Sequence, residues 1–245
     1  MKALILAAGY ATRLYPLTRE YPKSLLPVNG SPIIDYIIDK LARVDEIEEF
    51  IVITNNKFFR QFKAWQGKHR LKKKISIVND LTRDNATRLG AIGDMNFVLD
   101  KKRIKEDLLV IGGDNLFSGC VNRFLGFARK FSDCPVIGVY DIKKRSEASK
   151  YGVIKLDKSK RVIDFQEKPE DPKSTLVAMC LYYFPKRRLG LIQEYLHIRA
   201  KKDDAMGFYI DWLCNRVPVY GYAFSGKWFD IGDHKFYNAA KKSFK

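Results

Sequence analysis

Cysteine, histidine and long hydrophobic runs are scarce in this 245-residue chain. The four cysteines are scattered without a Cys-x-x-Cys pair, which argues against zinc or a disulfide scaffold and fits a reducing cytoplasm. No apolar run approaches the roughly 20 residues of a membrane span. The first one, Leu4 to Ala8, is shorter than the ~7–15 residues of a signal peptide's apolar region. The three histidines lie in basic or helical context, and we assign them no role.

Negative charge is scarce relative to positive charge, since 45 lysines and arginines face 28 aspartates and glutamates, a net of +17. This balance suggests anionic partners, such as a nucleotide, a sugar phosphate, a nucleic acid or a membrane surface. The basic residues form separate clusters between apolar segments, and we interpret them mainly as solvated loops and helix ends. Hydrophobic residues make up 46% of the chain, which predicts a globular protein with a substantial core.

The most informative stretch is residues 1–28. Lys2 to Leu6 predicts a buried strand, which runs into a turn of small residues at Ala7, Ala8, Gly9 and Ala11. Small side chains let a ligand approach the main chain, and the N–H groups of such a turn can cradle phosphate. Arg13 adds a fixed positive fork and Lys23 a mobile point charge. The turn alone is weak evidence, because tight packing explains it equally well.

Helical and strand patterns alternate through the first 140 residues, and the pattern then changes. Helices are predicted at residues 32–43, 124–131 and 186–215, and strands at residues 50–54, 75–78, 107–111, 135–140 and 217–224. Between residues 151 and 184, short apolar segments alternate with turns, which predicts an antiparallel extension. We therefore predict an α/β fold, a Rossmann-like three-layer sandwich with a mixed, mainly parallel central sheet and an antiparallel extension.

An acidic residue follows the central strand, in the string Gly112-Gly113-Asp114-Asn115. The carboxyl end of a buried parallel strand is where α/β proteins place their ligands. Asp114 could instead cap the next turn, but the preceding glycines and the first motif favour metal binding.

These motifs, in this order, resemble the signature of the sugar-phosphate nucleotidyltransferases, the enzymes that make nucleotide sugars. The resemblance extends over almost the whole chain and adds Thr87 with Gly90-Ala91, Tyr151-Gly152-Val153, Glu167-Lys168-Pro169 and Trp228-Phe229-Asp230-Ile231-Gly232. Two departures are visible. Ala11 stands where the family often has a second glycine, and Asp84-Asn85-Ala86 replaces the glycines expected before Thr87.

The resemblance implies a set of site residues. The nucleotide would be bound by Leu6, Ala7, Ala8, Gly9, Thr12, Arg13, Lys23, Asn79, Thr87, Gly90 and Asp114. The sugar phosphate would be bound by Asn115, Gly152, Glu167 and Lys168. Asp114 and Asp230 would hold Mg²⁺, and the catalytic residues would be Arg13, Lys23 and Asp114. A general base is not required, because a phosphate monoester with a second pKa of about 6 is already mostly ionised at neutral pH.

We predict a nucleotidyltransferase that condenses a nucleoside triphosphate with a sugar 1-phosphate, with glucose 1-phosphate and dTTP or UTP as first candidates. The nearest alternative is a cytidylyltransferase for phosphocholine or another alcohol phosphate. Alternatives of another class are a non-catalytic nucleotide-binding subunit and a nucleic-acid-binding protein, the latter suggested only by charge. We expect one cytoplasmic domain over residues 1–245, with 1–140 binding mainly the nucleotide and 141–245 mainly the sugar phosphate. The last motif lies close to the end of the sequence, so we expect no acetyltransferase domain built of repeats. The sequence leaves a homo-oligomer open.

Overall fold

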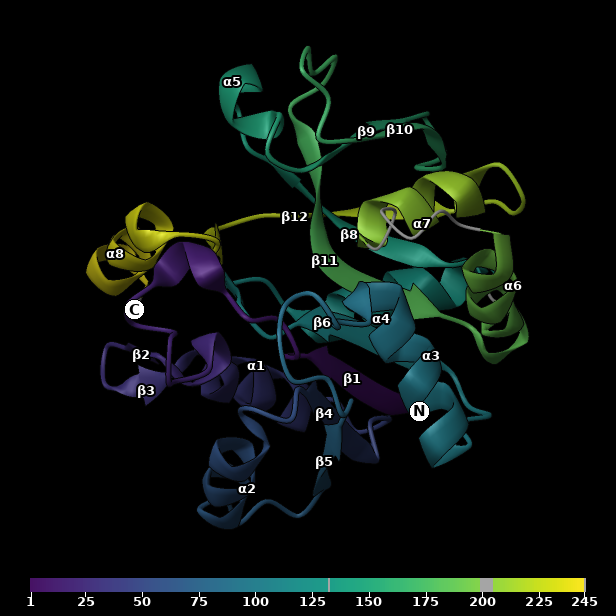
Figure 1. The fold of residues 1–245 in the computed structure, drawn as a ribbon. Helices are drawn as coiled ribbons and strands as arrows, with labels where there is room; N and C mark the ends of the chain where they lie inside the picture. Colours follow the sequence, from purple (N-terminus) through teal and green to yellow (C-terminus); the bar gives the residue numbers. More distant parts are fainter. Residues whose placement is uncertain (132, 199–204, 245) are drawn as a thin grey trace.

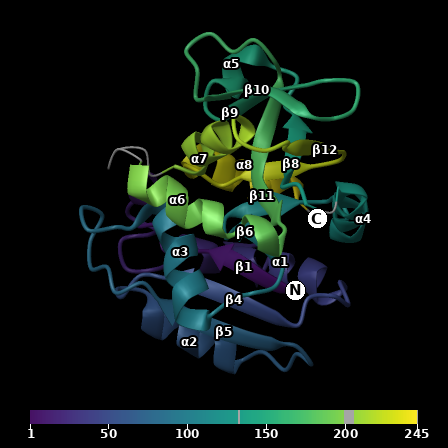
Figure 2. The ribbon, with the colours of Figure 1, turned by 90° about the vertical axis from the view of Figure 1, so that its right-hand side faces the viewer.

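The centre of the fold is a mixed, nine-stranded sheet with helices on both faces (Figure 1; Figure 2). It is seen in a computed structural model, which describes residues 1–131, 133–198 and 205–244. The strands of this sheet are β1 (Lys2–Leu6), β4 (Glu49–Thr54), β5 (Lys74–Asn79), β6 (Leu108–Gly112), β8 (Val136–Asp141), β9 (Gly152–Leu156), β10 (Val162–Glu167), β11 (Leu176–Phe184) and β12 (Tyr220–Phe224). The helices are α1 (Ile33–Ala42), α2 (Phe59–Gly67), α3 (Gly90–Lys102), α4 (Val121–Ala128), α5 (Arg145–Ala148), α6 (Gly190–Ile198), α7 (Met206–Cys214) and α8 (His234–Ser243).

Strand β1 lies at the centre of the parallel part of the sheet. It is flanked by β4 and β6, with Ile5 opposite Val52 on one side and Ile111 on the other. Its alternate residues face opposite layers: Ile5 packs in the cluster that holds α1, α2 and α4, and Leu4 in the cluster that holds α3, α6 and α7. The three-layer α/β fold predicted from the sequence is therefore confirmed.

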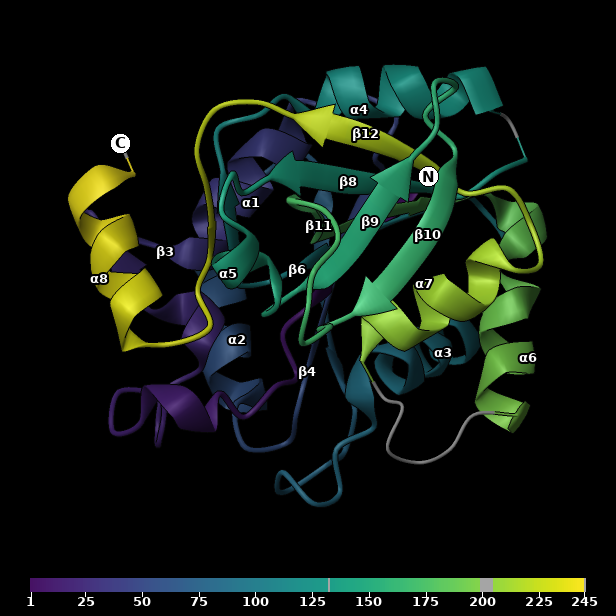
Figure 3. The same ribbon diagram turned by 90° about the horizontal axis from the view of Figure 1, so that it is seen from above.

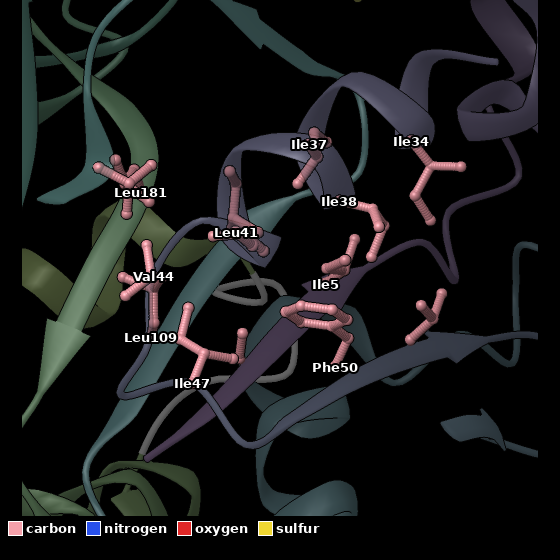
Figure 4. Packing of buried hydrophobic residues seen from close by; sticks show 14 of the residues in the cluster. Ile5, Ile34, Ile37, Ile38, Leu41, Val44, Ile47, Phe50, Leu109 and Leu181 are labelled. Carbon is pink, nitrogen blue, oxygen red and sulfur yellow. The ribbon is translucent and has the colours of Figure 1, made fainter. Parts of the chain in front are cut away.

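Helix α1 shows how apolar spacing fixes one of these layers. Its buried residues recur at helical spacing and pack on the sheet, and they include Ile34, Ile37, Ile38 and Leu41. Figure 4 shows these side chains with Ile5 and Phe50 in one packed cluster. Full burial of each side chain contributes about 1.5–3 kcal/mol to stability. This burial stabilises a helix that would be too short to form on its own.

The antiparallel extension is also confirmed. Strand β11 pairs antiparallel with β6, β8 and β9, and β9 pairs antiparallel with β10 (Figure 3). The β8–β11 ladder has an irregular register between Ala178 and Tyr182, and Cys180 within it has a positive φ of 47°. This kink lies where β11 passes the end of β6, so it bends the sheet at the edge that carries the candidate site.

The C-terminal motif around Asp230 packs against segments from earlier in the chain. The short strand β13 (Trp228–Asp230) pairs antiparallel with β7 (Asn115–Phe117), directly after β6. Asp233 then caps α8, because its Oδ1 accepts a hydrogen bond from Phe236 N at 3.0 Å. Tyr237 and Ala240 of α8 pack in one cluster with Leu14 from the loop after β1. Segments from both ends of the chain therefore lie together (Figure 1).

The remaining expectations differ from the structure in detail. The helix predicted over residues 186–215 is found as α6 and α7, and residues 199–204 between them lie outside the described part. The helix predicted at 124–131 begins earlier, at Val121, and becomes a 3₁₀ turn at Arg129–Phe131. Two short strands, β2 (Pro27–Val28) and β3 (Ser31–Pro32), form a hairpin before α1. Within the described ranges, no helix is long and apolar enough to cross a membrane.

Candidate active site

The loops after β1, β5 and β6 meet at the carboxyl edge of the parallel strands, and two cavities open there. The first, of about 260 Å³, is lined by Leu6, Ala8, Gly9, Asp80, Arg88, Gly90, Ala91, Asp94 and Ala205. The second, of about 210 Å³, has a lining that includes Asp114, Tyr151, Gly152, Glu167, Lys168, Trp228 and Asp230. The backbone connects the two, since Gly113 N–H donates to Leu6 O at 2.9 Å.

The loop after β1 is fixed by hydrogen bonds to neighbouring segments, and its main chain is accessible at Gly9. Ala7 N–H donates to Ile53 O at 2.9 Å, and the Asn55 side chain donates to Ala8 O at 2.9 Å. Ala11 adopts a left-handed conformation with φ 47°, and its carbonyl accepts from the Thr18 hydroxyl at 2.7 Å. This explains why glycine is common there in the resembled family. A Cβ built on Gly9 meets no atom within 4 Å, so the main chain there is free for close approach.

Asn79 and Thr87, both predicted to bind nucleotide, are engaged in shaping the loop after β5. Asn79 Oδ1 accepts from Leu81 N at 2.8 Å, and its amide donates to Asn56 Oδ1 at 2.9 Å. Thr87 N–H donates to Asp84 Oδ1 at 2.9 Å, and neither Asn79 nor Thr87 lines the first cavity. Thr12 is exposed beside the loop after β1, and Ala7 is buried beneath it.

Charged groups from three segments meet at the second cavity, whose lining includes Asp114 and Asp230. Lys23 Nζ donates to Asp114 Oδ2, and both side chains are about one-fifth exposed, at 20% and 23%. Asp230 pairs with Asn115 in the β13–β7 ladder, and Ile231 N–H donates to Asp114 O at 3.2 Å. The guanidinium of exposed Arg13 reaches the same place, because a Cβ on Gly232 would lie 3.6 Å from its Nη2.

The protonation of this cluster follows from burial and from neighbouring charge. Burial alone would lower the pKa of Lys23, but attraction from Asp114 and Asp230 outweighs it, and the net shift is upward. Burial and repulsion by Asp114 raise the pKa of Asp230, with Lys23 and Arg13 partly offsetting them. No group of three or more metal-ligating side chains occurs in the described residues. Two adjacent carboxylates nevertheless fit Mg²⁺, which takes one or two carboxylates and completes its shell with phosphate oxygens and water.

Glu167 dominates the second cavity. Its side chain is only 10% exposed, and burial raises its pKa although the Lys168 ammonium, 3.4 Å from Oε1, opposes that shift. Two glycines make room for its carboxylate: a Cβ on Gly152 would lie 3.2 Å from Glu167 Oε2, and one on Gly207 would lie 1.7 Å from the same atom. The cavity thus offers a buried carboxylate and a cation, beside two glycines at which the protein leaves no room for a side chain.

Asn115 was expected to contact the sugar phosphate, but the residue is only 1% exposed. Its amide donates to Met179 O and to Cys180 O, the latter at 3.2 Å, and its Oδ1 accepts from Trp228 Nε1. These bonds tie β7, β11 and β13 together beneath the second cavity. Asn115 therefore positions the strands, and its polar atoms are engaged within the protein.

Several site residues had no recognisable motif. Gly207 lies within an apolar helix, and no sequence pattern around it predicts the contact with the Glu167 side chain. Asp94 is polar and lies on the face of α3 that packs on the sheet, four residues after Gly90, a spacing that places both on one face. That spacing is the one signal by which a sequence could have placed Asp94 in the first cavity.

Comparisons with known proteins bear on this arrangement. Residues 2–245 match the family model described as Nucleotidyl transferase. The chain is 30% identical over 234 residues to a Sulfolobus acidocaldarius protein named "Putative mannose-1-phosphate guanyltransferase", covering 95% of this chain and 60% of that one. It is 31% identical over 234 residues to "Bifunctional protein GlmU" of Methanocaldococcus jannaschii, covering 95% and 51%.

A solved structure of UDP-glucose pyrophosphorylase complexed with UDP-glucose superposes with a TM-score of 0.82 at 21% identity, covering 99% of this chain and 97% of that one. At this identity the likeness concerns the fold alone. The chain spans between about half and 60% of the length of the two curated relatives above.

Proposed function

The chain belongs to the nucleotidyl transferase family, in its sugar-phosphate branch, and on that premise we propose that it condenses a nucleoside triphosphate with a sugar 1-phosphate. The products are a nucleotide sugar and pyrophosphate. The observation that carries the proposal is the cluster of Lys23, Asp114 and Asp230 at the wall of the second cavity, which the hydrogen bond from Gly113 N to Leu6 O connects to the first cavity. Such a cluster sits where the phosphates of two substrates, one in each cavity, would meet.

The first cavity and the loop beside it suit the nucleotide. The open main chain at Gly9 lets phosphate oxygens approach, and Arg13 supplies positive charge at its rim. In this proposal Arg13 neutralises charge on the β- and γ-phosphates as pyrophosphate leaves. Lys23 exchanges its bond with Asp114 for the α-phosphate and the attacking oxygen. Positioning and charge neutralisation of this kind need no general base.

The second cavity suits the sugar 1-phosphate. Glu167 accepts hydrogen bonds from sugar hydroxyls, the backbone at Gly152 lies against the ring, and Lys168 binds the phosphate. Mg²⁺, which this family generally uses, would be held by Asp114 and Asp230 and would supply positive charge to the reacting phosphates. The proposed division of labour largely follows the chain halves 1–140 and 141–245, although Asp114 and Ala205 cross it.

The sugar and the base stay open within this proposal. Glucose 1-phosphate with dTTP or UTP remains the prediction from the resemblance, whereas the name of one relative points to mannose 1-phosphate and a guanylyl group. The test is pyrophosphate release with Mg²⁺, across ATP, GTP, CTP, UTP and dTTP against glucose, mannose and N-acetylglucosamine 1-phosphates and phosphocholine. We expect release only where both a triphosphate and a sugar 1-phosphate are present. Release with phosphocholine alone would replace the proposal by the cytidylyltransferase, and no release from folded protein would overturn it.

A further inference from the structure

The charged residues that line the first cavity are two buried carboxyl groups and Arg88, and the proposed mechanism uses neither carboxyl group. Asp80 follows β5, and Asp94 lies on the second turn of α3. Leu6, Ala8 and Ala91 supply the apolar walls around them. A mostly apolar pocket with a few placed polar groups is the usual form of a site for a small organic ligand, such as a nucleobase.

Asp80 is fixed as a hydrogen-bond acceptor. It is 4% exposed, its Oδ1 accepts from Thr82 N at 2.7 Å, and its Oδ2 accepts from the Thr82 hydroxyl at 3.0 Å. The same hydroxyl lies 3.0 Å from the Tyr10 hydroxyl, which extends the network to the loop after β1. Burial raises the pKa of Asp80, and the hydrogen bonds from Thr82 and from the Asp94 carboxyl oppose that shift. These donors make Asp80 the member of the pair that is favoured as the carboxylate.

Asp94 is the unsatisfied member of the pair. It is 7% exposed, and its buried Oδ1 accepts no hydrogen bond from any donor in the described residues. Its carboxyl lies within hydrogen-bonding reach of Asp80, and burial together with that neighbour raises its pKa to about 8. The pair therefore holds one proton and one negative charge at neutral pH. A buried acceptor without a donor is costly, which indicates that a ligand supplies the donor.

We propose that Asp80 and Asp94 select a nucleobase with an exocyclic amino group, that is cytosine, adenine or guanine, over uracil and thymine. This inference rests on the proposed function and deepens it, since it names the class of triphosphate. It departs from the dTTP or UTP that the family resemblance suggested.

The choice follows from the edges of the bases. Cytosine, adenine and guanine each present an N–H₂ group, which donates to a carboxylate. Uracil and thymine instead present carbonyl oxygens on both sides of a single ring N–H, and an oxygen facing the carboxylate is repelled. A site built around buried acceptors discriminates strongly against a ligand that leaves them unpaired.

The experiment measures dissociation constants of the intact protein for all five triphosphates with Mg²⁺ at pH 7, and kcat/KM where turnover occurs. We expect at least one amino-bearing base to bind about tenfold to a hundredfold more tightly than UTP and dTTP, the range for a hydrogen bond to a charged group. Comparing CTP, ATP and GTP identifies which amino base fits.

Three variants separate base selection from a structural role. Asp94→Asn keeps a neutral group that donates to Asp80, so it should keep the preference. The double variant D80N/D94N removes the charge, and should reduce the preference by tenfold or more while UTP and dTTP change little. Asp100→Asn, at an exposed site on the same helix, is the matched control.

Two results would overturn the inference: equal binding of all five triphosphates by the wild type, or an equal loss for all five in the double variant. Selective binding of amino-bearing bases without turnover on any sugar phosphate would support the inference and contradict the proposed function. Turnover without base preference would support the proposed function and contradict the inference.

Discussion

Lys23 Nζ donates to Asp114 Oδ2, and this ion pair joins the loop after β1 to the end of β6 across 91 residues of sequence. Asp230 adds a second negative charge, and the two carboxylates keep Lys23 protonated despite its burial. The folded chain thus holds a cation beside the carboxylates where the proposed reaction places phosphates. A phosphate oxygen can replace Asp114 as the partner of Lys23 without any change of fold.

Asp114→Asn should remove Mg²⁺-dependent turnover while leaving the fold intact. Asparagine has the same size and can still accept from Lys23, but it lacks the charge that a divalent cation requires. We expect kcat/KM to fall by about a hundredfold or more, as when a group that stabilises transition-state charge is lost. Pyrophosphate release over a Mg²⁺ titration measures this, and EDTA should abolish wild-type release. Asp45→Asn, exposed near the amino end of β4, is the control, and retained full activity in Asp114→Asn would exclude the metal assignment.

Gly9→Ala should weaken nucleotide binding without affecting stability. The added methyl group meets no protein atom within 4 Å, so the free energy of unfolding should change by less than about 0.5 kcal/mol. A phosphate that approaches the main chain at Gly9 would meet that methyl group. We expect the KM for the triphosphate to rise by about tenfold, a loss near 1.4 kcal/mol, and the KM for the sugar phosphate to stay constant.

The control for Gly9 is Gly67→Ala at the end of α2, where the new methyl group is equally unobstructed. It should change neither KM. An unchanged triphosphate KM in Gly9→Ala would show that the nucleotide does not approach this part of the loop.

Gly207→Ala should impair the sugar-phosphate side alone. The methyl group would lie 1.7 Å from Glu167 Oε2 and 2.5 Å from its Cδ, so the carboxylate must turn away. Because the moving group is the end of a side chain, the fold should survive. Steady-state kinetics should show a raised KM for the sugar 1-phosphate, by about tenfold, with the triphosphate KM unchanged.

Gly126→Ala in α4 is the matched helical control for Gly207. Its Cβ meets nothing within 4 Å, and it should stabilise the protein by about 0.4–1 kcal/mol without kinetic effect. Equal increases in both KM values in Gly207→Ala would indicate a general distortion of the site. That result would contradict the assignment of Glu167 to sugar binding.

The order of strands and helices could be predicted because burial leaves a periodic record in the chain. Residues 50–53 of β4 and 108–111 of β6 are unbroken apolar runs because helices cover both faces of the sheet, and α1 shows its single buried face as a repeat. Gly9 and Asp114 were visible for a related reason, since they lie in the loops that follow β1 and β6. The exact ends of each strand depend on pairing with distant strands. For example, β12 begins only at Tyr220, which lies opposite Val136 of β8.

Contacts between distant segments left no such record. Nothing around Asn115 indicates that its amide is consumed by the backbone of β11 and by Trp228. Nothing near Gly207 indicates that Glu167 lies over it. The pairing of Asp80 with Asp94 likewise depends on where α3 packs. Sequence patterns report the environment of one segment, whereas these roles arise only when two segments meet.

Asp94 should make the protein less stable as the pH rises from about 4 to 8. Its pKa is raised from 3.8 to about 8 in the folded chain, chiefly by burial and then by Asp80. Between these values the folded state binds a proton that the unfolded state has lost, so the free energy of unfolding falls as pH increases. At 1.36 kcal/mol for each unit of pKa, the loss is on the order of 4 kcal/mol at pH 7.

Asp94→Asn should remove most of this loss, because asparagine is neutral at every pH and still donates to Asp80. Urea unfolding at pH 5, 6, 7 and 8 should show the variant gaining on the wild type at each step. Asp100→Asn, exposed on the same helix, should follow the wild-type slope. If the curves of Asp94→Asn and wild type ran parallel, Asp94 would be ionised in the folded protein throughout this range. The pair would then carry two charges, and the protonation state that underlies base selection would be wrong.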